Sequence, residues 1–415
     1  MKTKTYFNNL RLVVNTKKDT NIVSFNIFVG IGSKDDPSGS YGMAHFLEHM
    51  FFKSTKTKKY QEILNQLDNM GVSHNAYTST TKTCYYFKCI SSVLEPSVQL
   101  FSEMFFNTSF NRNEVEKEKK VILEEYKMDE DDQSKKAISN AFENIFYNNE
   151  FGHSIIGNPT SIKSITSEKL KRFKEKYLPS RVVISISGNI SFKKAEKLVK
   201  KYFADKFGKE KTEIEYNKYQ NINIKSKYIA KQKDNKQSVV YILYDFKEPD
   251  LKTISMYKIY FSILGDGLSS KFMSKIRNEL GLVYDIDAGA SRMGKNLMGE
   301  IMFATSNEYV KLAIKAIKEI LDSCANGEID KEELERAKNK LLTSIAFSNE
   351  SNSSIASSNG SSILSKGYIR TDKEIEQEVN SITIQDIKRV AIEVASNQNF
   401  VVSSVGKCKK QDLMF

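Results

Sequence analysis

The segment SITSEKLKRF at residues 164–173 returns later in the chain as SITIQDIKRV at residues 381–390, and this repeat decides the fold class. Two further pairs of segments match: VVISISGN (182–189) with FVVSSVGK (400–407), and NEVEKEKKVILEE (113–125) with EELERAKNKLLTS (332–344). The shifts are 217 to 219 residues, so the three matches share one register. A period this long indicates a duplicated domain and not a solenoid of short repeats.

Each copy combines strand-like and helix-like patterns. In the first copy, apolar runs predict strands, including one long strand over residues 76–90, and helical periodicity predicts helices such as 113–129. We therefore expect two homologous α+β sandwich domains, each a mostly antiparallel sheet with helices on one face. A polar stretch rich in Lys and Asn predicts a linker at 214–235, between domains at 1–213 and 236–415.

The composition is that of a globular protein, with 40% hydrophobic and 27% charged residues. The net charge is +12, but the basic residues are spread along the chain without a binding motif, so we expect no nucleic-acid partner. No run of 18 apolar residues occurs, so no membrane span is expected. The N-terminal residues lack a secretory apolar segment and the four cysteines are scattered, which favours a cytoplasmic protein.

The most informative short motif is HFLEH at residues 45–49. His45 and His49 are four residues apart, so both imidazoles leave the same face of a helix. Two nitrogens in this arrangement suit a tetrahedral zinc ion, and Glu48 lies near enough to take a proton from a water beside the metal. The alternative is a buried helix with two satisfied histidines. Against it, two of the four histidines of the chain fall inside these five residues.

A catalytic zinc ion needs a third protein ligand. Glu118 and Glu125 are seven residues apart and share one face of the helix predicted over residues 113–129. Such pairs are commonly solvated, and Glu114, Glu116 and Glu124 compete for the same role. Spacing alone does not choose among these glutamates.

The combined motifs resemble the pitrilysin-type metallopeptidases. His45, Glu48 and His49, followed after 75 residues by Glu125, are similar to the inverted zinc motif of that superfamily. Further segments with such a likeness are NNLRLVV (8–14, with Asn9 where Gly is usual), GVSHNAYTS (71–79), EKKVILEE (118–125) and GDGLSSKFMSKIRNELGLVY (265–284). The likeness thus covers nearly the whole chain and points to the short, processing-peptidase-like members.

The resemblance implies a zinc metalloendopeptidase that hydrolyses peptides or unfolded segments. It implies one Zn²⁺ per chain, held by His45, His49 and Glu125, with Glu48 as general base and Glu118 as a carboxylate that orients a ligand. Residues implied to contact substrate are Asn75, Ala76 and Tyr77, beside which the peptide would add as a β-strand, and Arg277 and Tyr284, which would stabilise the oxyanion.

The second copy carries no equivalent metal motif. Residues 271–275 (KFMSK) stand opposite the histidine motif, and Ser344 stands opposite Glu125. The resemblance therefore implies one site per chain, in half of a clamshell chamber that a homodimer would close. A heterodimer with a metal-less paralogue, acting on leader peptides, is the second choice. A non-catalytic scaffold subunit is the rival from another class.

Overall fold

The computed structural model describes residues 1–209, 211–247 and 249–415. These residues form two compact units, and each unit is discontinuous in sequence. The first unit comprises Met1–Tyr126, Ser154–Asn217 and Phe347–Ile369. The second comprises Lys127–His153, Lys218–Ala346 and Arg370–Phe415.

The first unit is built on a six-stranded sheet with the order β1-β2-β6-β3-β5-β4. Its strands are β1 (Lys2–Thr5), β2 (Arg11–Thr16), β3 (Ile22–Val29), β4 (Ser73–Thr78), β5 (Thr83–Ile90) and β6 (Val182–Gly188). The β2–β6 pair is parallel and the other pairs are antiparallel. The prediction of one long strand over residues 76–90 is wrong, because a turn divides this segment into β4 and β5. At the turn, the Ser79 N–H donates a hydrogen bond to the Lys82 carbonyl oxygen at 2.8 Å.

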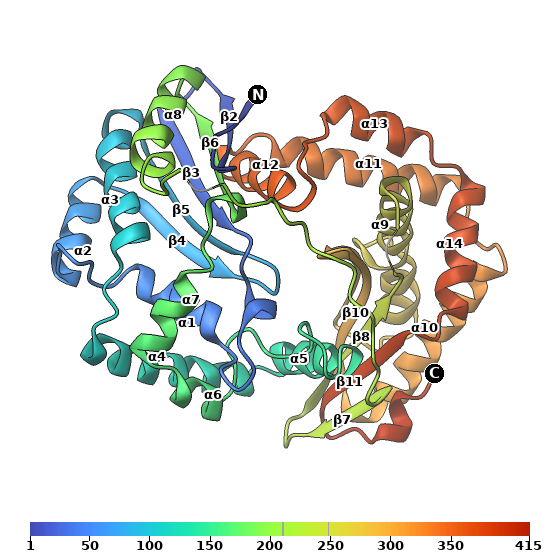
Figure 1. Cartoon of the computed structure of the whole chain (residues 1–415). Coiled ribbons are helices and arrows are strands. Elements are labelled where there is room, and N and C mark those ends of the chain that lie inside the picture. Colours follow the sequence, from blue (N-terminus) through green and yellow to red (C-terminus); the bar gives the residue numbers. More distant parts are fainter. Residues whose placement is uncertain (210, 248) are drawn as a thin grey trace. The chain divides into compact units, whose positions relative to one another are not determined.

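Helices cover both faces of this sheet. The helices of the first unit are α1 (Met43–Phe51), α2 (Tyr60–Asn69), α3 (Leu94–Asn107), α4 (Arg112–Asp131, which ends in the second unit), α6 (Pro159–Ser164), α7 (Ser167–Lys174), α8 (Phe192–Val199) and α12 (Asn352–Lys366). Strand residues alternate between the faces. Leu12 and Val14 therefore join the main core with α1 and α3, whereas Val13 packs on the opposite face with Ile363 and Leu364 of α12. Figure 1 shows α3 and α12 on opposite sides of the sheet.

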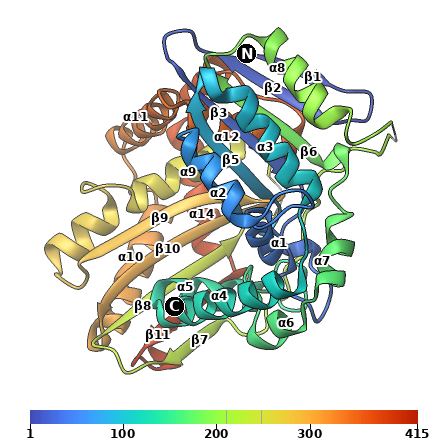
Figure 2. The same ribbon diagram turned by 90° about the vertical axis from the view of Figure 1, so that its left-hand side faces the viewer.

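The second unit has a five-stranded sheet with the order β7-β11-β8-β10-β9. Its strands are β7 (Tyr228–Gln232), β8 (Gln237–Asp245), β9 (Asp285–Met293), β10 (Asn296–Ser306) and β11 (Phe400–Gly406). Its helices are α5 (Gln133–Ile145), α9 (Leu251–Gly265), α10 (Val310–Ala325), α11 (Lys331–Ser348, which ends in the first unit), α13 (Asp372–Asn380) and α14 (Ile384–Ser396). In Figure 2, β8, β10 and β9 run side by side in this sheet.

The two sheets share one topology, which confirms the predicted duplication. In each sheet a parallel pair is followed by antiparallel partners, so that β2-β6-β3-β5-β4 corresponds to β7-β11-β8-β10-β9. The repeated segments at residues 182–189 and 400–407 form β6 and β11, which hold the same place in the two sheets. The prediction of two homologous α+β units, each with a mostly antiparallel sheet, is therefore confirmed.

A helix from the other half of the sequence covers the second face of each sheet, so the expectation of helices on one face only is wrong. Ile363 and Leu364 of α12 pack on the first sheet, and Ala137 and Ala141 of α5 pack on the second. The contact is close, since a Cβ on Gly360 would lie 2.3 Å from the Phe28 ring. The compact units are not continuous in sequence, so they cannot be compared directly with domain boundaries at residues 213 and 236. Those boundaries stay a prediction about where the two copies of the repeat begin and end.

No helix among the described residues is long and apolar enough to cross a membrane. All four cysteines are free and buried.

Candidate metal centre

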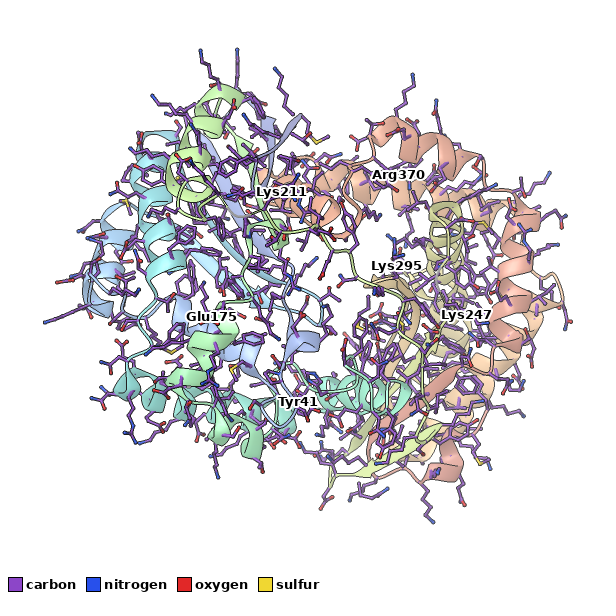
Figure 3. All side chains as sticks on the ribbon, in the orientation of Figure 1. Tyr41, Glu175, Lys211, Lys247, Lys295 and Arg370 are labelled. Carbon is purple, nitrogen blue, oxygen red and sulfur yellow. The ribbon has the colours of Figure 1, made fainter. Side chains whose placement is uncertain are left out.

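Helix α1 carries the histidine motif, and its start is tightly specified. Gly42 precedes it at φ 91°, where a Cβ would lie 2.4 Å from the Ile156 carbonyl oxygen, so glycine is required there. Asp36 accepts hydrogen bonds from the Gly42 N–H (2.7 Å) and the Ala44 N–H (2.8 Å), which satisfies amides at the helix start. Tyr41, labelled in Figure 3, accepts a hydrogen bond from Ser161 through its carbonyl oxygen at 2.8 Å. These contacts fix the helix rotation and hence the direction of its side chains.

One face of α1 is buried in the main core and the other carries the polar groups. The buried residues are Met43, Ala44, Phe46, Leu47, Met50 and Phe51. His45, Glu48 and His49 are only partly buried. The core face therefore turns these three side chains toward α4 and β4, where their hydrogen-bonding partners lie.

His45, His49 and Glu125 form the group that could hold a metal ion among the described residues, with ligand atoms within 4.8 Å of one another. Glu125 Oε1 lies 3.8 Å from His45 Nε2, and Glu125 Oε2 lies 3.4 Å from His49 Nε2. A tetrahedral zinc ion with bonds of about 2.0–2.1 Å sets its ligand atoms about 3.3 Å apart, which is close to these separations. Two imidazoles and one carboxylate are also a ligand set that zinc uses in enzymes. The residues present therefore fit the ion.

The environments of the two histidines differ. Burial, together with the neighbouring His49, lowers the pKa of His45 to about 4, so this imidazole is neutral near pH 7. Its Nδ1 atom is buried and makes no hydrogen bond to any described residue. For His49, burial alone would lower the pKa, but Glu118 and Glu125 outweigh it and raise the pKa to about 9.

Glu118 is the carboxylate that holds His49 in place. Its Oε1 atom lies 2.8 Å from His49 Nδ1, and its Oε2 atom lies 2.6 Å from Lys53 Nζ. Burial would raise the pKa of Glu118, but the bonds from His49 and Lys53 outweigh burial and hold it below its usual value. A carboxylate on Nδ1 keeps the proton there and leaves the Nε2 lone pair for a metal ion.

The glutamates that spacing left open make other contacts. Glu114 binds the Ser54 hydroxyl and Glu116 pairs with Lys119 at 2.8 Å. Glu124 is exposed. The structure thus separates Glu118 and Glu125 from their competitors on α4.

Glu48 lies beside this group and accepts a hydrogen bond from the Thr78 hydroxyl at 2.5 Å. Burial raises the pKa of Glu48, and the bond from Thr78 opposes that shift. A carboxylate with a raised pKa is suited to take a proton and later to return it.

The predicted substrate residues lie on β4, the last strand in its sheet order. Asn75 Oδ1 accepts the Ala76 N–H at 2.8 Å, so that amide is not committed to β5. The Ser79 N–H donates a hydrogen bond to the Lys82 carbonyl. In an antiparallel pair, successive residues direct their backbone N–H and C=O groups alternately toward and away from the partner strand. The backbone groups of Tyr77 therefore face β5, and those of Ala76 face the open edge. The side chains also alternate: Ala76 packs against the main core, and Tyr77 packs against the cluster on the opposite face.

Arg277 and Tyr284 lie in the second unit and contact each other. The Arg277 guanidinium carbon lies 5.1 Å from the centroid of the Tyr284 ring. Arg277 belongs to a π-helical segment, Met273–Glu279, and Tyr284 is 79% exposed. The two side chains that the sequence resemblance paired therefore lie next to each other in the structure.

Three residues that position the motif were not predicted from the sequence. Thr78 binds Glu48, Lys53 binds Glu118, and Asp36 caps α1. Lys53 stands four residues after His49, a spacing that could have drawn attention to it. Thr78 and Asp36 act across loops, for which the sequence holds no comparable signal.

A duplicated α+β fold with one HxxEH helix is the architecture of the pitrilysin-type metallopeptidases, as the sequence resemblance implied. The chain belongs to this class, as a member of peptidase family M16. Residues 11–159 match the family described as Insulinase (Peptidase family M16), and residues 164–341 match the Peptidase M16 inactive domain. The metal group lies in the first of these matched segments.

Similar proteins carry the name zinc protease. The uncharacterized zinc protease YmxG of Bacillus subtilis is 30% identical over 390 residues, which cover 92% of this chain and 93% of that protein. A protein of Mycobacterium leprae with a similar name is 28% identical over 387 residues, covering 92% of this chain and 86% of its own length.

Solved structures share the fold over the full length. The crystal structure of a protease from Helicobacter pylori has a TM-score of 0.88 at 22% identity, covering 98% of this chain and 99% of that chain. A chain in a structure of complex III2 from Candida albicans has a TM-score of 0.80 at 16% identity, covering 100% and 97%.

Proposed function

We propose that this protein is a zinc-dependent endopeptidase that hydrolyses peptides or unfolded segments. The observation that carries the proposal is the meeting of His45, His49 and Glu125 within 4.8 Å, with Glu48 on the same helix. The zinc protease names of the relatives support the same conclusion. One Zn²⁺ per chain is expected, because the second copy lacks the motif.

The chemistry assigns a separate role to each side chain. A zinc ion bound at this group would supply Lewis acidity to the peptide carbonyl and acidify a water molecule. Glu48 takes the proton of the attacking water and delivers it to the departing amine. Thr78 holds the Glu48 carboxylate through its 2.5 Å hydrogen bond, and Glu118 keeps His49 in the tautomer with a free Nε2.

The substrate would bind as an added strand along β4. The Ala76 backbone at the open edge offers a donor and an acceptor to an extended peptide. Asn75 and Tyr77 flank it, and the Asn75 side chain must release the Ala76 N–H before the peptide can bind it. Arg277 and Tyr284 would hold the substrate carbonyl and stabilise the oxyanion.

We propose a homodimer as the working assembly, with each chain supplying half of an enclosed chamber. The support is the presence, in one chain, of both the metal group and the Arg277–Tyr284 pair. A heterodimer with a metal-less paralogue that processes leader peptides is the second candidate. The cytoplasmic location stays a prediction from the sequence.

A scaffold role without catalysis is the rival function, since a chain of complex III2 shares the fold. Metal content separates the two. The peptidase should purify with about one zinc per chain, or take it up stoichiometrically, whereas a scaffold has no need of the ion.

The decisive experiment compares four proteins for zinc content and for cleavage of an internally quenched peptide. Glu48→Gln should keep zinc and lose cleavage by about 10²–10⁴-fold, because only proton transfer is removed. His45→Ala should lose both zinc and cleavage. Glu124→Gln, on the exposed side of α4, serves as the control and should match the wild type. Near-normal turnover in Glu48→Gln would refute its role as base.

A further inference from the structure

We propose that Lys53 is a positioning residue of the metal centre, which fixes the Glu118 carboxylate so that Glu118 can orient His49. The inference rests on the proposed zinc site and adds a residue to it. Lys53 lies just beyond α1, two residues after Phe51, where the helix ends. Only three residues separate Lys53 from His49, so the position of Lys53 is tied to that of the histidine motif.

The two oxygens of Glu118 are divided between two partners. Oε1 contacts His49 Nδ1 at 2.8 Å, and Oε2 contacts Lys53 Nζ at 2.6 Å. The side chain of Glu118 is only 7% exposed, so water cannot replace either partner easily. With one oxygen held by Lys53, rotation of the carboxylate about its last bond is restricted. The other oxygen then stays directed at the imidazole.

Lys53 is itself held by a second contact. Its ammonium lies 4.9 Å from the centroid of the Tyr60 ring, at the start of α2. An ammonium between a carboxylate and an aromatic face has few other positions available. The series Tyr60, Lys53, Glu118, His49 thus connects α2 and α4 to the metal-facing edge of α1.

The simpler alternative is that Lys53 only ties helices together. The chain offers a control in Lys119, which is also a largely buried lysine in an ion pair and lies on α4 next to Glu118. Lys119 pairs with Glu116 at 2.8 Å, and its side chain is 11% exposed, compared with 22% for Lys53. The side chain of Glu116 is 56% exposed, whereas that of Glu118 is 7% exposed, and no ion pair joins Glu116 to a histidine among the described residues. Loss of Lys119 therefore removes an ion pair from the same helix without removing a contact of the metal group.

The test is a double-mutant cycle on zinc affinity, measured by competition with a chelating dye at fixed pH. Lys53→Met keeps the aliphatic stem and should weaken Zn²⁺ binding by about 10–100-fold, as expected when an outer partner of a ligand is lost. Lys53→Arg, which retains the charge, should restore most of the affinity. Lys119→Met should bind zinc within about twofold of wild type, the variation expected from sites outside the network.

The cycle is completed in a Glu118→Gln background. If Lys53 acts through Glu118, Lys53→Met should add less than about twofold to the loss that Glu118→Gln already causes. The proposal would be overturned if the two substitutions together reduced zinc affinity by the product of their separate effects. It would also be overturned if Lys53→Met alone bound zinc with wild-type affinity. Should Lys53→Met not fold by circular dichroism, Lys53→Gln replaces it in both backgrounds. A wild-type protein that binds no zinc would instead refute the proposed function.

Discussion

Asp36 is a residue whose ionisation should set part of the pH dependence of stability. Burial raises its pKa to about 7, although the amides of Ala44 and Gly42 favour the charged form. In an unfolded chain an aspartate titrates near pH 3.9, so the folded state binds the proton more tightly. The stabilisation is fully present below about pH 4 and is lost as the pH rises through about 7.

The variant Asp36→Asn cannot titrate and isolates this contribution. The wild-type free energy of unfolding should therefore decline more steeply between pH 5 and pH 7.5 than that of Asp36→Asn. Urea denaturation at several pH values measures both slopes. A wild type that gains stability relative to the variant over this range would mean that the helix amides outweigh burial.

At this scale the sequence predicted the residues that share a helix turn and missed those that meet across loops. His45, Glu48 and His49 follow from helical spacing. The third ligand did not, because several glutamates of α4 satisfy the same spacing and only packing tells them apart. Thr78 approaches Glu48 from a strand 30 residues away, a contact that depends on the register of β4 against β5.

The open edge of β4 gives a prediction about substrate binding. Ala76→Pro removes the outward N–H without removing a bond to β5, and proline is tolerated at such edge positions. Cleavage of the quenched peptide should fall in kcat/KM by at least about two- to tenfold, since a lost hydrogen bond costs about 0.5–1.5 kcal/mol. Zinc content and the melting temperature should stay near those of the wild type.

Tyr77→Pro is the matched control for this strand, since Tyr77 is directed toward β5 and its loss should lower the melting temperature. If Ala76→Pro cleaves the peptide as well as the wild type, the substrate does not use this edge.

Helix α12 gives a prediction in which the usual sign is reversed. Glycine to alanine within a helix ordinarily stabilises by about 0.5–1 kcal/mol. At Gly360 the added Cβ would lie 2.3 Å from Phe28, so Gly360→Ala should destabilise by about 1–3 kcal/mol through overpacking. Ser358→Ala, exposed on the same helix, should be neutral or slightly stabilising. Chemical denaturation of both variants checks this, and a more stable Gly360→Ala would contradict the tight contact.

The sequence predicted elements of the first copy, such as the helix over residues 113–129, because amphipathic periodicity and turn residues are local signals. It did not predict where α12 packs. That helix is rich in serine, as NSSIASSNGSSILSK at residues 352–366, and its small side chains indicate close packing without naming the partner. The partner strands, β2, β3 and β6, lie more than 160 residues away in sequence.

At the scale of the whole molecule, the proposed dimer predicts complementation between two inactive proteins. Glu48→Gln retains Arg277, and Arg277→Ala retains Glu48. If Arg277 and Tyr284 act on the metal centre of the partner, mixed dimers contain one intact site. Random exchange of equal amounts should then restore about a quarter of the wild-type cleavage rate, because half the dimers are mixed and each has one working site of two.

Exchange is verified by native mass spectrometry of differently tagged chains. No recovery after complete exchange would place the pair within its own chain or outside the reaction. The duplication itself was readable at this scale because three matches kept one register. The reciprocal placement of α5 and α12 was not readable, since it depends on packing between sequence-distant segments.

The placement of α12 has a consequence for synthesis on the ribosome. The strands β2, β3 and β6 and the histidine helix emerge early, yet the residues that cover Val13, Phe28 and Val183 emerge only with positions 352–366. Until then the nascent chain exposes one apolar face of its first sheet. The unit that carries the metal group is therefore complete only after residue 366 has been made, so a chain whose synthesis stops before this helix lacks one face of that unit.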